Sequence, residues 1–263
     1  MNDTRDDSGS KPLQELKILL IQLRKDREAL PAEQKGFVSL SGLREDQFEI
    51  LDVYREPGFP AGIIDRYDGI MVGGLSDDPS NSTEVSTRIF PFLESFHALL
   101  SRMVELNKPG LLSCGGFMLA SVLLGGRIAI DPGKSELGIV SIRLSEEGSK
   151  DPLLRETPEI FKAVSGHIKS TVQLPPDSRL LAFSEKCPVH AFRINSAPVY
   201  AFQFHPEITC ADLESRVARY KDKYFSSEQE YLDFLTLMDD TSAANRIVRR
   251  FVELVAPQQA RRG

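Results

Sequence analysis

The chain has few of the residues that disulfide frameworks and metal sites require. Its three cysteines are odd in number and show no paired spacing, and none of its four histidines has a partner at a zinc-ligand spacing. We therefore expect no metal, and nothing in the sequence indicates a cofactor. The cysteine usage, together with the absence of a visible secretory leader, favours a reducing, cytoplasmic location.

A long apolar run and an excess of basic residues are also missing. The apolar segment around Cys114 is too short and too rich in glycine to span a membrane. The net charge is −6, and no stretch is basic enough to indicate a nucleic-acid surface. We therefore expect neither a membrane nor a nucleic acid among the partners.

Length and composition fit one folded unit. A chain of 263 residues with 41% hydrophobic and 27% charged content can bury one sizeable core. The acidic start, which contains serine and glycine, predicts a disordered tail over residues 1–12. We expect a single domain over 13–256, with a helical extension from about residue 210, and a second tail over 257–263.

Apolar patterns divide this domain into strands and helices. Three buried strands are expected, over residues 16–23, 48–54 and 68–73. Apolar residues at helical spacing predict a helix over 83–106. Pro91 either lies in the first turns of this helix or breaks the helix there. From Ile139 onward the strands become shorter, which indicates a mixed extension of the sheet. Three helices are expected in the extension, over 211–224, 227–237 and 242–255, and would cover a cleft or form a homodimer surface.

The segment LLSCGGFMLASVLLGG places a thiol between an apolar strand and an apolar helix. At a helix N-terminus, unpaired N–H groups and the helix dipole favour the thiolate of Cys114 over the thiol. Gly115 and Gly116 permit the tight turn that would expose the sulfur in a cleft. A buried, inert cysteine is the alternative for such a segment when it stands alone.

The segment YAFQFHPE places a histidine and a carboxylate two residues apart at a strand end. In an extended chain, residues i and i+2 point to the same side, so His205 and Glu207 can lie next to each other. Glu207 could then orient the imidazole as a base for Cys114.

Paired glycines follow the strand in YDGIMVGGLS. Gly73 and Gly74 would leave backbone N–H groups approachable at the carboxyl end of a parallel strand. The N–H groups of Gly74 and Gly115 are the two expected oxyanion donors, each contributing roughly 3 kcal/mol to transition-state stabilisation.

These segments together resemble the class I, triad-type glutamine amidotransferases, and within them the free-standing GMP-synthase-like proteins. The resemblance extends to SELGIVSIRL, VSGHIKSTVQLPPDSRLLAFS and PVHAFRINSAPVYAFQFHPE. It implies an α/β fold, a three-layer α/β/α sandwich with a mostly parallel, flavodoxin-like central sheet and additional C-terminal helices. It also implies a γ-glutamyl thioester formed from glutamine, with release of ammonia.

The resemblance also implies residue roles. Cys114 is the nucleophile, His205 the base and Glu207 the orienting carboxylate. The implied substrate-binding positions are Gly73, Met118, Glu136 and His167.

Several positions depart from the family pattern: Leu75 stands where the usual proline follows the glycine pair, and Lys169 or Ser170 where the pattern has an acidic residue. Two further departures bear directly on the site. Leu112 stands where the pattern has glycine, and Met118 where it has glutamine. Leu112 would crowd the turn, so we expect the turn to shift or to find room for a branched side chain. Met118 would replace a polar contact to glutamine with an apolar surface.

Three functional interpretations follow from these departures. The first is cleavage of the γ-glutamyl amide of glutamine, with ammonia passed to a separate synthase subunit, since the chain is too short to contain one. The second is hydrolysis of another γ-glutamyl compound with the same triad. The third is a catalytically weakened binding or regulatory module that retains the fold.

Overall fold

The computed structural model describes residues 12–75, 81–219, 221 and 225–256. The two expected tails lie outside these residues, apart from Pro12. Among the helices of the described part of the chain, none is long and apolar enough to cross a bilayer.

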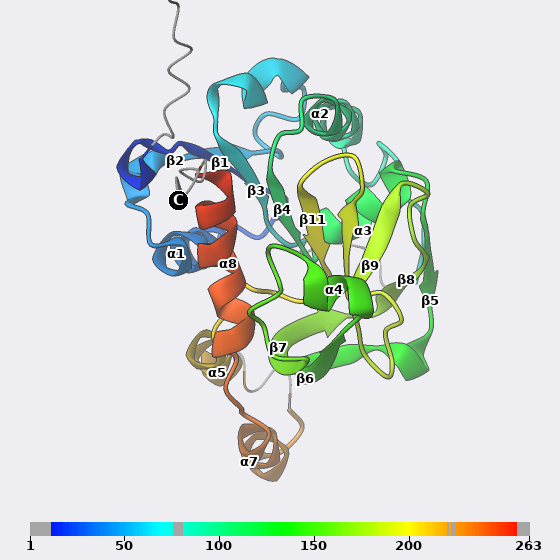
Figure 1. The fold of residues 1–263 in the computed structure, drawn as a ribbon. Coiled ribbons are helices and arrows are strands. Elements are labelled where there is room, and N and C mark those ends of the chain that lie inside the picture. The colour runs from blue at the N-terminus through cyan, green and yellow to red at the C-terminus, as the bar shows by residue number, and fades with distance from the viewer. Residues whose placement is uncertain (1–11, 76–80, 220, 222–224, 257–263) are drawn as a thin grey trace, which may run out of the picture.

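One nine-stranded sheet forms the middle of the molecule (Figure 1). Its strand order is β2-β1-β3-β4-β11-β10-β9-β6-β7. The first five strands in this order run parallel, as in a doubly wound 2-1-3-4-5 sheet: β2 (Phe48–Asp52), β1 (Ile18–Gln22), β3 (Gly69–Val72), β4 (Gly110–Ser113) and β11 (Val199–Phe202). In such sheets, ligands bind beyond the carboxyl ends of the strands.

The other half of the sheet is antiparallel, which confirms the expected mixed extension. Its strands are β10 (Ala191–Ile194), β9 (Ser178–Phe183), β6 (Glu136–Leu144) and β7 (Ile160–His167). The expectation of shorter strands is wrong, because β6 has nine residues and β7 eight, whereas the strands of the parallel half have four or five. A separate two-stranded antiparallel sheet joins β5 (Arg127–Ile130) to β8 (Lys169–Gln173).

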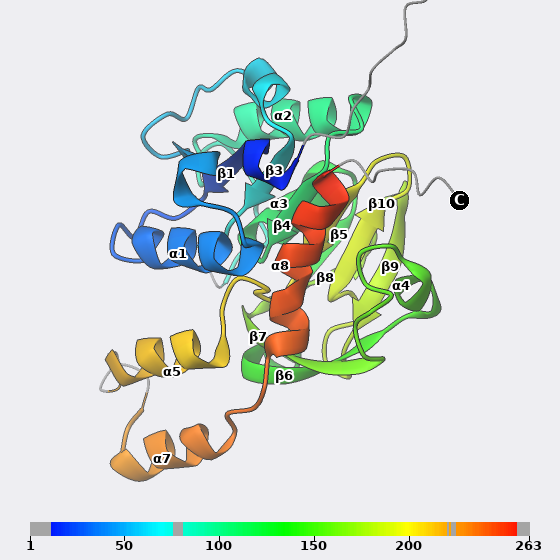
Figure 2. The same cartoon turned by 60° about the vertical axis from the view of Figure 1, so that its left-hand side comes forward.

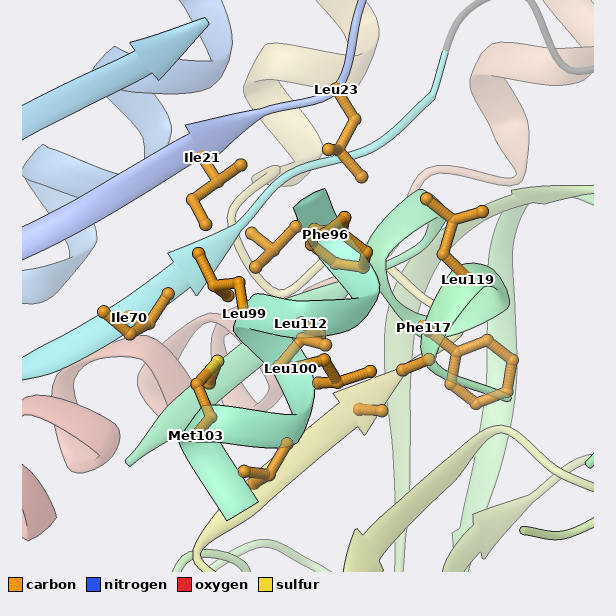
Figure 3. Packing of buried hydrophobic residues seen from close by; sticks show 14 of the residues in the cluster. Ile21, Leu23, Ile70, Phe96, Leu99, Leu100, Met103, Leu112, Phe117 and Leu119 are labelled. Atoms are coloured by element: carbon orange, nitrogen blue, oxygen red, sulfur yellow. The ribbon is translucent and has the colours of Figure 1, made fainter. Parts of the chain in front are cut away.

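Helices cover both faces of the sheet and give the expected three layers. The helices α2 (Leu93–Glu105) and α3 (Gly115–Leu123) contribute to one apolar cluster, part of which Figure 3 shows. The helices α1 (Leu30–Ser41) and α8 (Ser242–Val255) contribute to a second cluster, on the other face (Figure 2). All five side chains of β1 are buried, because a parallel strand covered on both faces meets apolar side chains on each.

Smaller elements complete the described chain. The helices α5 (Cys210–Arg219) and α7 (Glu228–Thr236) lie next to each other at the end of the molecule near β6 and β7 (Figures 1 and 2). The short helix α4 packs beside β9, and four 3₁₀ turns connect other elements. Their bounds are Glu146–Lys150 for α4, and Leu13–Glu15, Glu45–Gln47, Ala61–Arg66 and Pro132–Lys134 for the turns.

One expected helix is shorter than its apolar pattern predicts. The pattern over 83–106 predicts helix throughout, but α2 begins only at Leu93, and residues 87–89 form a turn. Pro91 has no N–H to donate, and it disfavours helical geometry at Phe90. The three expected C-terminal helices are present as α5, α7 and α8, and α8 covers the expected residues 242–255. Residues 220 and 222–224 of the first expected helix lie outside the described residues.

Leu112 fits without crowding the turn that follows it. Its side chain is fully buried in the first apolar cluster, near Leu99 and Leu100 of α2 (Figure 3). The branched side chain therefore lies in the core, which is the second of the two outcomes expected for this position.

We expect Phe251→Ala in α8 to destabilise the protein by about 3–5 kcal/mol, because this side chain is fully buried in the second cluster. Urea unfolding followed by circular dichroism measures the change. Leu237→Ala is the control, because Leu237 is 67% exposed and should change stability by no more than about 0.5 kcal/mol. Equal effects of the two substitutions would show that α8 does not contribute to the core.

Candidate active site

Cys114 occupies a strained turn between β4 and α3. Its backbone has φ +45° and ψ −91°, a rare conformation for a residue with a Cβ. The Cys114 N–H donates to Phe202 O at 2.7 Å, and the Met118 N–H donates to Cys114 O at 2.9 Å. These bonds fix the turn from β11 and from α3, and the thiol is left half-buried at the helix N-terminus.

Glycine is required at both positions after Cys114, because Leu75 and Val72 approach the backbone there closely. A Cβ on Gly115 would lie 2.5 Å from the Leu75 nitrogen, and one on Gly116 would lie 2.9 Å from a methyl of Val72. The helix therefore starts in contact with the loop after β3. This contact brings the Gly73–Gly74 segment beside the thiol, as the sequence predicts.

His205 and Glu207 form the expected pair. His205 Nδ1 lies 2.6 Å from Glu207 Oε1, and both side chains are buried. The Ser113 hydroxyl donates to the other carboxylate oxygen of Glu207 at 2.8 Å. The backbone N–H of His205 donates to Val164 O at 2.8 Å, and this bond anchors the histidine on β7.

Burial and charge act in opposite directions on this pair. Burial alone lowers the pKa of His205, but the charges of Glu207 and Cys114 and its hydrogen bonds to both outweigh burial and raise that pKa to about 10. Burial alone raises the pKa of Glu207, but the charge and hydrogen bond of His205 hold it below its usual range. At neutral pH the arrangement therefore favours a His205 imidazolium beside a Glu207 carboxylate.

A second buried pair, Arg24 and Glu33, holds the glycine loop. Arg24 Nε lies 2.7 Å from Glu33 Oε2, and an Arg24 guanidinium nitrogen donates to Leu75 O at 3.1 Å. The Gly74 N–H donates to Glu33 Oε2 at 3.0 Å. The expected oxyanion donor of Gly74 is thus bonded to Glu33 in this structure, whereas Gly115 is the first residue of α3, where N–H groups lack intrahelical partners.

The sequence analysis missed Ser113, Arg24 and Glu33. Arg24 follows the buried strand β1 at the carboxyl edge of the parallel sheet, which was a usable signal for a site residue. The Glu33 carboxylate can lie against the Gly73 backbone only because Gly73 lacks a side chain. A Cβ on Gly73 would lie 2.3 Å from Glu33 Oε1. Ser113 gave no such signal, because a small polar residue at a strand end is common.

A cavity of about 250 Å³ opens over the thiol. Cys114 and His205 line it together with glycine and apolar residues of the β6–β7 hairpin. The outer wall is apolar and comes from the C-terminal extension, through Leu213 and Val217 of α5 and Phe234 of α7. The extension therefore forms one wall of this cleft, which is the first of the two roles expected for it.

None of the four implied substrate-binding residues lines this cavity. Gly73 is buried against Glu33, and Met118 is buried in the first apolar cluster. Glu136 and His167 lie in a buried polar cluster at the paired ends of β6 and β7, although their neighbours Leu137 and Gly166 do reach the cavity. Contact of these four residues with a substrate stays a prediction.

We expect Arg24→Ala to destabilise the protein by roughly 3–5 kcal/mol, because Glu33 is then left buried without the guanidinium. Arg44→Ala is the matched control, because its pair with Asp46 is exposed and contributes about 0–1 kcal/mol. Denaturant unfolding compares the two variants. A loss for Arg24→Ala as small as that of the control would show that the pair does not hold the loop.

Comparison with known proteins places this geometry in a family. The model of the class-I glutamine amidotransferases matches residues 54–221. A glutamine-hydrolyzing GMP synthase subunit of Thermococcus kodakarensis is 35% identical over 42% of this chain, and the match spans only 57% of that relative's length. Gamma-glutamyl peptidase 3 of Arabidopsis thaliana is 25% identical over 81% of this chain and 83% of its own.

Solved structures support the fold. A glutamine amidotransferase from Thermotoga maritima aligns with a TM-score of 0.70 over 92% of this chain and 99% of its own, at 17% identity. One from Methylobacillus flagellatus aligns with a TM-score of 0.68 over 94% and 98% of the two chains, also at 17% identity. With a family model that matches well over half of its residues, the chain belongs to the class-I glutamine amidotransferases.

Proposed function

We propose that this chain hydrolyses a γ-glutamyl amide through a Cys114-His205-Glu207 triad. The observation that carries the proposal is that the half-buried thiol of Cys114, at a helix N-terminus, shares one cavity with an imidazole that Glu207 orients. A nucleophile, a base and an orienting carboxylate in one cavity are the parts that covalent amide hydrolysis requires.

The proposed reaction has two halves. Cys114 Sγ attacks the γ-carbonyl carbon, and the C–N bond then breaks as the His205 imidazolium gives its proton to the leaving nitrogen. This leaves a γ-glutamyl thioester and releases ammonia or an amine. Water then attacks the thioester carbon, His205 takes the proton from that water, and glutamate leaves as the thiolate re-forms.

The oxyanion of each half-reaction would accept hydrogen bonds from Gly115 and Gly74. Gly115 offers an N–H at the start of α3, next to the sulfur. The Gly74 N–H first has to leave Glu33 Oε2, which requires a small rotation of the loop after β3. In this proposal, the buried Arg24–Glu33 pair sets how readily that donor turns toward the cavity.

Two substrate classes are distinguished by their leaving groups. Glutamine releases ammonia, which in the GMP-synthase-like interpretation passes to a separate synthase subunit. A γ-glutamyl peptide or amine releases a larger group, and the apolar wall from α5 and α7 offers it a contact surface. The match to a gamma-glutamyl peptidase over most of both chains favours the second class.

The test measures hydrolysis of glutamine and of a series of γ-glutamyl dipeptides by the purified chain. Free glutamate, ammonia and the released amine or amino acid are quantified, and a γ-glutamyl adduct on Cys114 is sought by mass spectrometry. We expect turnover of at least one γ-glutamyl compound by the wild type and none by Cys114→Ala. Absence of both turnover and adduct in the folded wild type would leave the binding-module interpretation in place.

We expect the triad substitutions to differ in severity. His205→Ala should abolish turnover because the proton donor and acceptor is gone, whereas Glu207→Gln should retain roughly 10- to 100-fold more activity than His205→Ala. Steady-state kinetics on the best substrate, with circular dichroism as the folding control, measures this order. A folded Glu207→Gln as inactive as Cys114→Ala would show that Glu207 does more than orient the imidazole.

Cys114 is expected to react with iodoacetamide at neutral pH roughly tenfold or more faster than the other two thiols. Cys187 is fully buried, and burial raises its pKa to about 11. Cys210 is half-buried, and its Sγ atom lies 3.8 Å from Met238 Sδ. Peptide mapping of a labelling time course measures the three rates. Equal rates in the folded protein would argue against an activated thiolate.

A further inference from the structure

A buried group of four metal-ligating side chains lies outside the triad. It consists of Glu136, His167, Cys187 and His190, and one ligand atom from each lies within 4.8 Å of all the others. Glu136 and His167 face each other across the paired ends of β6 and β7. Cys187 and His190 come from the connection between β9 and β10, so three chain segments meet here.

The hydrogen bonds of this group centre on one carboxylate. Glu136 Oε2 lies 3.0 Å from His167 Nε2 and 2.6 Å from His190 Nε2. Glu136 Oε1 accepts from the Ser184 hydroxyl at 2.8 Å. Both oxygens of the Glu136 carboxylate therefore have hydrogen-bonding partners, and the Nε2 atoms of the two imidazoles converge on Glu136 Oε2.

The other imidazole nitrogens are left without partners. The Nδ1 atoms of His167 and His190 are buried and have no hydrogen-bond partner among the described residues. A buried polar atom without a hydrogen-bond partner lowers the stability of the fold by about 1–3 kcal/mol. Two such nitrogens in one cluster are therefore unfavourable if the cluster serves only to pack the core. Two imidazoles, a thiol and a carboxylate whose ligand atoms lie within 4.8 Å of one another are a donor set that a metal ion can bind.

We propose that Glu136, His167, Cys187 and His190 form a four-coordinate site for a zinc-type divalent cation. Imidazole nitrogen, thiolate sulfur and carboxylate oxygen are the ligands that zinc takes in tetrahedral sites. Metal–ligand distances of about 2.0–2.3 Å place tetrahedral ligands roughly 3.3–3.8 Å apart, so atoms already within 4.8 Å need to move by no more than about 1 Å. Coordination releases the thiol proton of Cys187 to solvent.

The site would be structural, because all four positions are filled by protein ligands and all four residues are buried. Its effect would reach the Cys114 cavity through the chain itself. Leu137 and Gly138 follow Glu136, Gly166 precedes His167, and all three line the cavity. A bound cation would therefore fix the end of the β6–β7 hairpin that forms one wall. The sequence analysis expected no metal because these ligands have no recognisable spacing along the chain.

The test uses the full chain, stripped with a chelator and then titrated with Zn²⁺ and with Co²⁺. We expect one equivalent of either metal to bind, with a thiolate-to-cobalt charge-transfer band and tetrahedral d–d bands for Co²⁺. Cys187→Ser should abolish the charge-transfer band, and His190→Gln should weaken Zn²⁺ affinity at least tenfold. Added Zn²⁺ should raise the melting temperature of the wild type and leave that of His190→Gln unchanged.

Matched controls separate this site from other thiols and histidines. Cys210→Ser and His97→Ala change a half-buried thiol and an exposed imidazole away from the cluster, and both should bind metal as the wild type does. Cys114→Ser should also bind one full equivalent of metal. The proposal is overturned if the wild type binds less than a stoichiometric amount, or if binding is lost in Cys114→Ser and retained in Cys187→Ser, which would place the metal at the triad.

Discussion

The backbone of Cys114 is the constraint on which the rest of the site depends. A positive φ at a residue with a side chain costs roughly 1–3 kcal/mol and persists only where the surrounding fold imposes it. Here Phe202 O on β11 and the Met118 N–H on α3 provide the fixing hydrogen bonds, and glycines allow α3 to touch the loop after β3. The strained turn therefore forms only when the sheet, the helix and the loop are assembled, and that assembly places the thiol at the carboxyl edge of the parallel strands.

Buried charge is concentrated next to that turn. His205 and Glu207 are both buried, and each keeps its charge because the other is 2.6 Å away, with Ser113 satisfying the second carboxylate oxygen. Burial raises the pKa of Glu33, and the Arg24 charge only partly opposes this. The two pairs interact as well, since Glu207 also raises the pKa of Glu33. A change of charge on either pair therefore shifts the pKa values of the other, which couples the glycine loop to the His205–Glu207 pair.

The walls of the cavity come from the parts of the chain that lie outside the parallel half of the sheet. The β6–β7 hairpin supplies one wall, and α5 and α7 supply an apolar cover. The match to the Thermococcus GMP synthase protein covers less than half of this chain, whereas the gamma-glutamyl peptidase match covers most of it. Cys114 thus lies at the parallel half of the sheet, while much of the cavity wall comes from β6, β7, α5 and α7.

The sequence by itself determined most of the elements and the groups proposed to react. Buried strands, the Cys114 turn and the His205–Glu207 pair are all encoded within short windows, where apolar periodicity and i, i+2 spacing report local geometry. Tertiary structure alone decided that the Ser113 hydroxyl donates to Glu207, 94 residues away, and that the Gly74 N–H donates to Glu33. It also decided that Met118 packs in the core and that Glu136 meets His190. These contacts depend on strand register and on the direction of side chains across layers, because a one-residue shift would turn each side chain to the opposite face.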